Sequence, residues 1–142
     1  MNYTDNKKEL NKLKLVLFDS ICKQKCITIT TRKVPVDEIP SDIPLSMRNF
    51  YSEFAPVNIN LHPLNIKFLP YEMVFSFLYD TPSIEFIPIA VKDKNRTIYI
   101  DKYSDGSWDE RIQLDVGNGK VQILGEDIFD FMANMAKNLL SF

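Results

Sequence analysis

His62 is the only histidine in this 142-residue chain. A serine or cysteine nucleophile would need it as the general base that accepts the proton of the nucleophile. It stands in the stretch NLHPLN, directly before Pro63, where the sequence is typical of a loop. The G-x-S-x-G signature of a hydrolase nucleophile does not occur. A solvated loop histidine explains this position better than a catalytic base does, and we expect the protein not to be an enzyme.

Side chains that could hold a metal or a cofactor are equally sparse. Cys22 and Cys26 lie one helical turn apart, but a structural zinc site needs four ligands, and the chain adds only one distant imidazole. The stretch DKYSDG, which begins at Asp101, is similar to the start of a calcium loop. Its twelfth position, however, is Ile112, where the loop requires a bidentate glutamate. The four glycines form no phosphate-binding motif, and we expect no metal and no cofactor.

One polar stretch, YSDGSWDE at 103–110, has the composition of a binding surface. It joins two predicted strands, holds the only tryptophan, Trp108, and groups aromatic with acidic side chains. Aromatic residues surrounded by charge are common at interface hot spots, although Trp108 could instead close the sheet edge while the acids keep the loop soluble. The acidic members would form a patch that attracts a basic partner. The candidate partner-binding residues are Asp101, Tyr103, Asp105, Trp108, Asp109 and Glu110.

The second half of the chain predicts a series of strands followed by a helix. Asn118-Gly119 separates two alternating runs and predicts a tight hairpin, because a primed turn requires positive φ. Pro88 inside a strand-like run predicts an edge position or a bulge, since proline cannot donate to the ladder. The predicted strands are 85–91, 96–101, 111–116 and 120–124. The last helix, 126–140, is expected to bury Ile128, Phe131, Met132, Met135 and Leu139.

The first half predicts two helices with short strands around them. Apolar residues spaced three and four apart predict an amphipathic helix over 5–24, and Pro44 is expected to begin a second one over 45–54. CITITT between them alternates and suits a strand. The tract 72–79 fits a helix or a strand equally well by its period. Further strands are expected at 57–61 and 66–68. The expected core-facing residues are Leu10, Leu13, Val16, Leu17 and Ile21 of the first helix and Leu45, Phe50 and Phe54 of the second.

The predicted order of elements indicates an α+β fold. We expect a single domain, residues 1–142, with a mostly antiparallel sheet of four to six strands flanked by N-terminal and C-terminal helices. A net charge of −2 argues against direct binding of nucleic acid. Two cysteines are too few for a disulfide framework, and no apolar run approaches the roughly 18 residues of a membrane span. We therefore expect a cytoplasmic protein without a membrane partner.

Three stretches resemble the SUKH superfamily, small α+β proteins that include bacterial immunity proteins and fungal regulators of cell-wall synthesis. IPSDIPLSMRNFYSEF is similar to the proline-led helix of that family, and IEFIPIAVKDKNRTIYID to its central hairpin. ILGEDIFDFMANM is similar to its closing strand and helix, with Phe129 or Phe131 in the place of a characteristic inward-facing phenylalanine. Together these stretches cover roughly residues 40–135.

The resemblance implies a binding function. The superfamily shares no catalytic set, so no active-site residue is transferred to this chain. Many bacterial members neutralise a polymorphic or contact-dependent toxin by occluding its toxic domain. The expected partner is therefore a cognate toxin domain, of which a nuclease is one kind, bound stoichiometrically and without a cofactor. The alternative is an intracellular regulatory or scaffold protein of the same fold that has no toxin partner.

Overall fold

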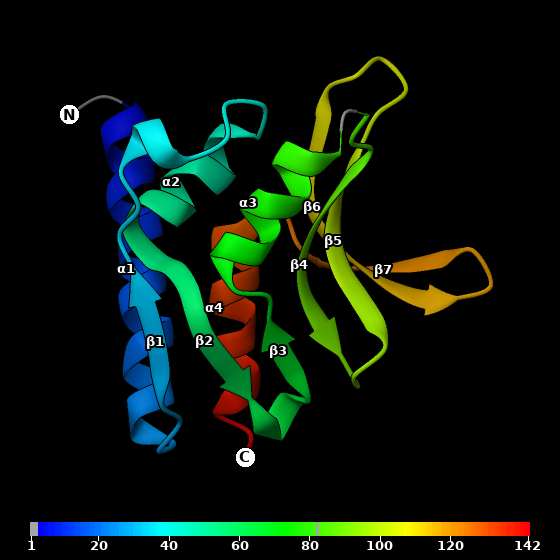
Figure 1. Cartoon of the computed structure of the whole chain (residues 1–142). Coiled ribbons are helices and arrows are strands. Elements are labelled where there is room, and N and C mark those ends of the chain that lie inside the picture. The colour runs from blue at the N-terminus through cyan, green and yellow to red at the C-terminus, as the bar shows by residue number, and fades with distance from the viewer. Residues whose placement is uncertain (1–2, 82) are drawn as a thin grey trace.

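The computed structural model describes the backbone of residues 3–81 and 83–142 (Figure 1). The described α-helices are α1 (Tyr3–Gln24), α2 (Leu45–Phe54), α3 (Tyr71–Asp80) and α4 (Ile128–Leu139). The described strands are β1 (Ile29–Arg32), β2 (Ala55–Leu61), β3 (Ile66–Phe68), β4 (Phe86–Lys92), β5 (Arg96–Lys102), β6 (Trp108–Gly117) and β7 (Lys120–Gly125). Two short 3₁₀-helices are η1 (Val36–Glu38) and η2 (His62–Leu64).

The strands described in the structure form one seven-stranded sheet in the order in which they occur along the chain. Each strand pairs with the next one antiparallel. This meander, with helices at both ends of the chain, confirms the predicted α+β fold. The sheet has more strands than the four to six expected, because the short strands β1 and β3 also join the ladder.

The predicted β6–β7 hairpin turn and the proline irregularity are confirmed by the backbone. Asn118 and Gly119 have φ values of 57° and 73°, as a primed hairpin turn between β6 and β7 requires. Gly106, with φ of 90°, turns the chain between β5 and β6. Pro88 lies at a shift in the β4–β5 register, which makes it part of a bulge rather than an edge strand.

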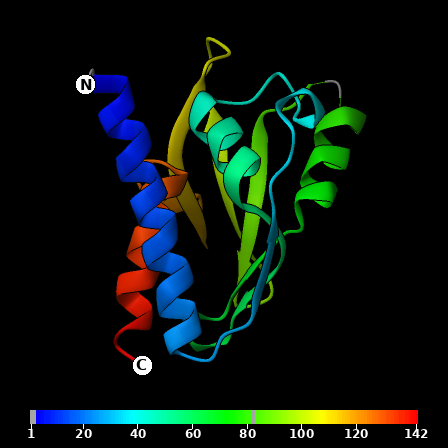
Figure 2. The ribbon, with the colours of Figure 1, turned by 90° about the vertical axis from the view of Figure 1, so that its left-hand side faces the viewer.

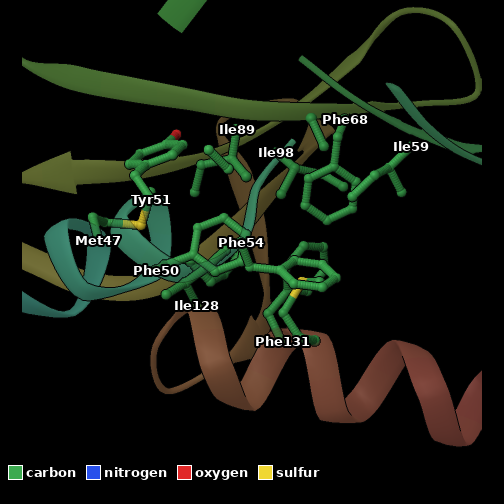
Figure 3. Packing of buried hydrophobic residues seen from close by; sticks show 14 of the residues in the cluster. Met47, Phe50, Tyr51, Phe54, Ile59, Phe68, Ile89, Ile98, Ile128 and Phe131 are labelled. Carbon is green, nitrogen blue, oxygen red and sulfur yellow. The ribbon is translucent and has the colours of Figure 1, made fainter. Parts of the chain in front are cut away.

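The core lies between the inner side of the sheet and the helices (Figure 3). Phe50 of α2 contacts Phe129 of α4 edge to face, with 6.1 Å between ring centroids. Phe68 of β3 lies 6.0 Å from Phe131 of α4. Both phenylalanines of α4 are therefore inward-facing. The predicted stripe of α4 is confirmed, since Ile128, Phe131, Met132, Met135 and Leu139 are all buried.

The predicted inner stripe of α1 is wrong except for Ile21. The helix instead buries a neighbouring stripe, in which Phe18 packs edge to face on Phe54 with 6.0 Å between ring centroids. Two apolar stripes run along this helix with the same period, so spacing cannot decide which one meets the core. Among the α1 side chains whose burial is described, from residue 6 onward, Leu15, Phe18, Ile21 and Cys22 are buried, whereas Leu10, Leu13, Val16 and Leu17 are exposed.

Packing also decides two further points about the helices. The ambiguous tract 72–79 is helical, and α3 buries one face. Leu45, expected in the core, is exposed at the first turn of α2. The buried face of α2 holds Met47, Phe50, Tyr51 and Phe54, and the helical period places Leu45 on the opposite side. The buried residues of α3 are Tyr71, Val74, Phe75 and Leu78.

Cys26 ends the turn after α1 in a conformation that favours glycine. Its φ is 59°, its N–H bonds to the Lys23 carbonyl at 3.1 Å, and the Ile27 N–H bonds to the Cys22 carbonyl at 2.8 Å. This is the hydrogen-bond pattern of a Schellman motif. Replacing Cys26 with glycine should therefore raise the free energy of unfolding by about 0.5–1 kcal/mol in urea titrations. Cys26→Ala, which keeps the Cβ, should gain none of this, and equal stability of the two variants would contradict the prediction.

Candidate partner-binding surface

The β5–β6 ribbon separates the six candidate residues onto two sides. Asp101 pairs with Asp109 across the ribbon, and Lys102 pairs with Trp108. Successive side chains on a strand point to opposite faces. Lys102 thus shares the side of buried Ile100, toward the helices, whereas Asp101 and Asp109 face outward. The candidate residues do not form one continuous surface.

Trp108 lies on the inner side and closes the end of the ribbon. Its ring is half-buried, and the Lys102 ammonium lies 4.8 Å from the ring centroid. The same ammonium is 3.8 Å from the Asp42 carboxylate and donates a hydrogen bond of 3.4 Å to the Ile84 carbonyl. The indole N–H is buried and meets no acceptor among the described residues. These contacts favour the interpretation of Trp108 as a packing residue that ties β6 to the segments around it.

Two of the acidic candidates serve local structure. The Glu110 carboxylate accepts a hydrogen bond of 2.5 Å from the Ser46 hydroxyl, which links β6 to the first turn of α2. The Asp105 carboxylate accepts hydrogen bonds from the Ser107 hydroxyl at 2.6 Å and the Ser107 N–H at 2.9 Å. These bonds lower the pKa of Asp105 and hold the turn after β5. Both carboxylates remain exposed.

Asp109 is the centre of the outward-facing group. Its carboxylate is buried and accepts three hydrogen bonds from the Arg111 side chain, at 2.9 Å and 3.2 Å from Nε and at 2.7 Å from Nη2. Gln113 Nε2 donates to it at 3.2 Å. The Arg111 hydrogen bonds lower the pKa of Asp109, although its burial opposes them, and a hydrogen bond from Tyr103 adds to the effect. The same contacts raise the pKa of the Arg111 guanidinium.

This ion pair corrects the expected acidic patch. The Asp109 charge is compensated by Arg111 and cannot contribute a free negative field. Arg111 and Gln113 were not among the predicted residues, yet they follow Asp109 at i+2 and i+4, the spacing that places strand residues on one face. That alternation was the available signal, and it would have found both.

The outward side of the ribbon continues into a wider surface, which we call the outer face of β4–β7. Phe86 contacts Tyr99 with 6.1 Å between ring centroids, Tyr99 pairs with Gln113, and Gln113 pairs with Ile123. Figure 1 shows these strands at the right-hand edge of the molecule, with the helices to their left. The strand registers place Phe86, Tyr99, Asp101, Asp109, Gln113, Val121 and Ile123 on the outer face, and their hydrogen bonds to Asp109 add Arg111 and Tyr103. Four of its side chains, Phe86, Tyr103, Val121 and Ile123, are at least 39% exposed, which makes the face a candidate interaction surface.

The remaining residues with chemical potential lie elsewhere. His62 is exposed at the start of η2. The Cys22 thiol is buried in α1, and this burial, together with the nearby Asp19 carboxylate, raises its pKa to about 11. A thiol with such a pKa stays protonated at neutral pH and is a poor nucleophile. Cys26 is exposed.

Metal binding and membrane spanning each require a structural feature that can be looked for in the described residues. Within the described residues, no group of three or more His, Cys, Asp or Glu side chains could hold a metal ion. Among the helices of the described ranges, none is both long and apolar enough to cross a membrane.

Comparisons with protein-family models, with curated proteins and with solved structures gave no match to this chain.

Proposed function

We propose that this protein binds and neutralises a cognate toxin domain in the cytoplasm, and that it holds the toxin with the outer face of β4–β7. One observation supports the choice of this face as the binding surface: exposed aromatic and aliphatic side chains surround a preformed Arg111–Asp109 ion pair. Tyr, Trp and Arg are the residues most enriched at interface hot spots. The toxin as partner is supported by the resemblance to the SUKH superfamily. The cytoplasm is supported by two free thiols.

Arg111 is suited to act as an anchor because its partner holds it in place. Two of its nitrogens are engaged by Asp109, and its side chain is still 46% exposed. A guanidinium whose orientation is already fixed loses less conformational entropy on binding than a free one. A carboxylate or carbonyl of the toxin that accepts hydrogen bonds from the fixed Arg111 guanidinium would be bound in a defined geometry. The aromatic rings of Phe86 and Tyr99 beside it would supply buried apolar area.

The acidic candidates have a smaller role in this proposal. Asp101 belongs to the outer face, and Asp105 lies in the exposed turn at its end. Glu110 lies on the helix side of the ribbon, where it bonds Ser46 of α2. Exposed rim charges mainly change the association rate and its dependence on salt. We expect charge reversal at Asp101 or Asp105 to slow the association with a basic toxin and to leave the dissociation rate nearly unchanged.

The test is a tagged pull-down from the native cell, with the bound proteins identified by mass spectrometry. We expect one stoichiometric partner whose toxic activity is blocked by an equimolar amount of this protein. Tyr103→Ala and Ile123→Asp should each weaken that complex by about 30-fold or more, the effect of a hot-spot residue. Val36→Ala, a change at an exposed apolar residue outside this face, should bind like the wild type.

Each other outcome contradicts one part of the proposal. A partner without toxic activity would favour the regulatory or scaffold alternative. A toxin bound equally well by Tyr103→Ala and Ile123→Asp would place the interface on another surface. Circular dichroism melts of each variant confirm that a loss of binding does not come from a loss of folding.

A further inference from the structure

The side of α1 that faces away from the core carries an apolar strip. Figure 2 shows α1 at the front of the molecule with no other element across it. Helix α1 packs on α4 through its opposite side, where Phe18 and Cys22 are buried. Single exposed apolar residues are common on protein surfaces, whereas a contiguous apolar strip is typical of a contact surface. Its members are Leu10, Leu13, Val16 and Leu17, with exposed fractions of 51%, 64%, 63% and 41%.

The strip has the spacing of a coiled-coil seam. Leu10, Leu13 and Leu17 are separated by three and then four residues, which corresponds to heptad positions a, d and a. In the same register, Glu9, Val16 and Lys23 are seven residues apart and occupy the flanking g positions. A seam of two heptads is too short to form a helix by itself, but α1 is already held in a helix by its packing on α4.

We propose that α1 pairs with α1 of a second copy of this chain, antiparallel and across a two-fold axis. In such a pair a positions face d positions and g positions face g positions in reverse order. Leu13 then meets Leu17 of the second copy, and this contact occurs twice. Val16 meets Val16, and Glu9 meets Lys23 of the second copy, also twice. Leu10 faces the exposed Ser20 of the second copy, at the end of the seam. The axis relates each of these contacts to an equivalent one or to itself, as a two-fold interface requires.

The ion pairs within each chain favour the antiparallel arrangement. Lys23 has a side chain that is 75% exposed and a bond of 2.9 Å to Asp19, an exposed pair that contributes little and can be shared with Glu9 of the second copy. A parallel pair would instead need Lys14 as the partner of Glu9. Lys14 is only 22% exposed and is held by Asp130 at 2.8 Å. In the antiparallel pair, Lys14 lies close to Lys14 of the second copy. The bond to Asp130 compensates each of these two positive charges and so reduces their repulsion.

The full-length chain in sedimentation velocity gives the direct test. The strip is short, so we expect a weak dimer that forms over about 5–200 µM protein. Leu13→Glu should raise the dissociation constant by about 100-fold, because each dimer loses two central leucines. Met73→Glu makes the same type of change at an exposed residue of α3 and should dimerise like the wild type. A monomeric wild type at the highest concentration overturns the proposal, and so does a dimer that Leu13→Glu leaves intact.

A charge exchange tests the orientation of the pair. Glu9→Lys and Lys23→Glu should each weaken the dimer by about tenfold, since every single change places like charges opposite each other. The double variant Glu9→Lys/Lys23→Glu restores opposite charges and should dimerise like the wild type. Failure of this rescue would exclude the antiparallel pair. A monomeric wild type that co-sediments with phosphatidylglycerol vesicles would assign the strip to a lipid surface instead. Tyr103→Ala should dimerise normally, which separates this interface from the toxin-binding face.

Discussion

Replacing Gly125 with alanine is expected to lower the free energy of unfolding by about 3 kcal/mol, as an overpacked site does. Gly125 ends β7 directly before α4 and is buried. A Cβ at this position would lie 2.6 Å from the backbone nitrogen of Phe131 and 3.1 Å from the Asp127 carbonyl oxygen. Backbone atoms of a helical turn cannot rotate away as the end of a side chain can. Either β7 or the first turn of α4 must move, and Phe131 is part of the core.

Urea unfolding followed by circular dichroism measures this effect. Glu126→Ala changes the next residue, which is exposed, and should stay within about 0.5 kcal/mol of the wild type. The expected loss for Gly125→Ala is therefore specific to the close approach of β7 and α4. A Gly125→Ala variant as stable as the Glu126→Ala control would show that the two elements are not packed at this distance.

The second large effect is expected at Asp109. Asp109→Asn should lower the free energy of unfolding by about 2 kcal/mol at pH 7, because it replaces charge-assisted hydrogen bonds to Arg111 with neutral ones. The pKa of Asp109 is lowered in the folded protein, so the carboxylate stabilises the fold at any pH above its unfolded pKa of about 3.9. That contribution is lost as the pH falls through the lower folded pKa. The difference between wild type and Asp109→Asn should therefore be constant from about pH 5 to 8 and shrink below about pH 4.

Urea titrations at a series of pH values check this dependence. Asp115→Asn removes the same charge from an exposed position on the same strand and should have a small effect. Asp105 also has a lowered pKa, but it is present in both proteins and cancels in the difference. A difference between wild type and Asp109→Asn that stays constant down to about pH 2 would contradict the role of the charged form.

Local signals along the chain predicted most of the secondary structure. Asn118-Gly119 specified its hairpin because few residues tolerate two consecutive positive φ values. Pro88 signalled its bulge because it lacks a donor. The stripe of α4 was predicted correctly because the helix has one strongly apolar face. Each of these features depends on residues near to one another in the sequence.

Local sequence signals did not predict how the six candidate residues are arranged in space. The sequence drew attention to 103–110, and this stretch does border the outer face of β4–β7. It did not show that Trp108 would pack inward beneath Lys102 while Asp109 would pair with Arg111. The six candidate residues were treated as neighbours because they are close in sequence, whereas the pleat of a strand sends successive side chains to opposite sides.

By itself, the sequence determined the α+β class, the hairpins of the second half and the inward face of α4, because turn chemistry and hydrophobic period act locally. Only the tertiary structure decided which stripe of α1 is buried and whether 72–79 is a helix. Two apolar stripes of equal period compete in α1, and only the shape of the rest of the core selects the one that contains Phe18. The tertiary structure thus leaves Leu13 and Leu17 exposed and available to a second copy.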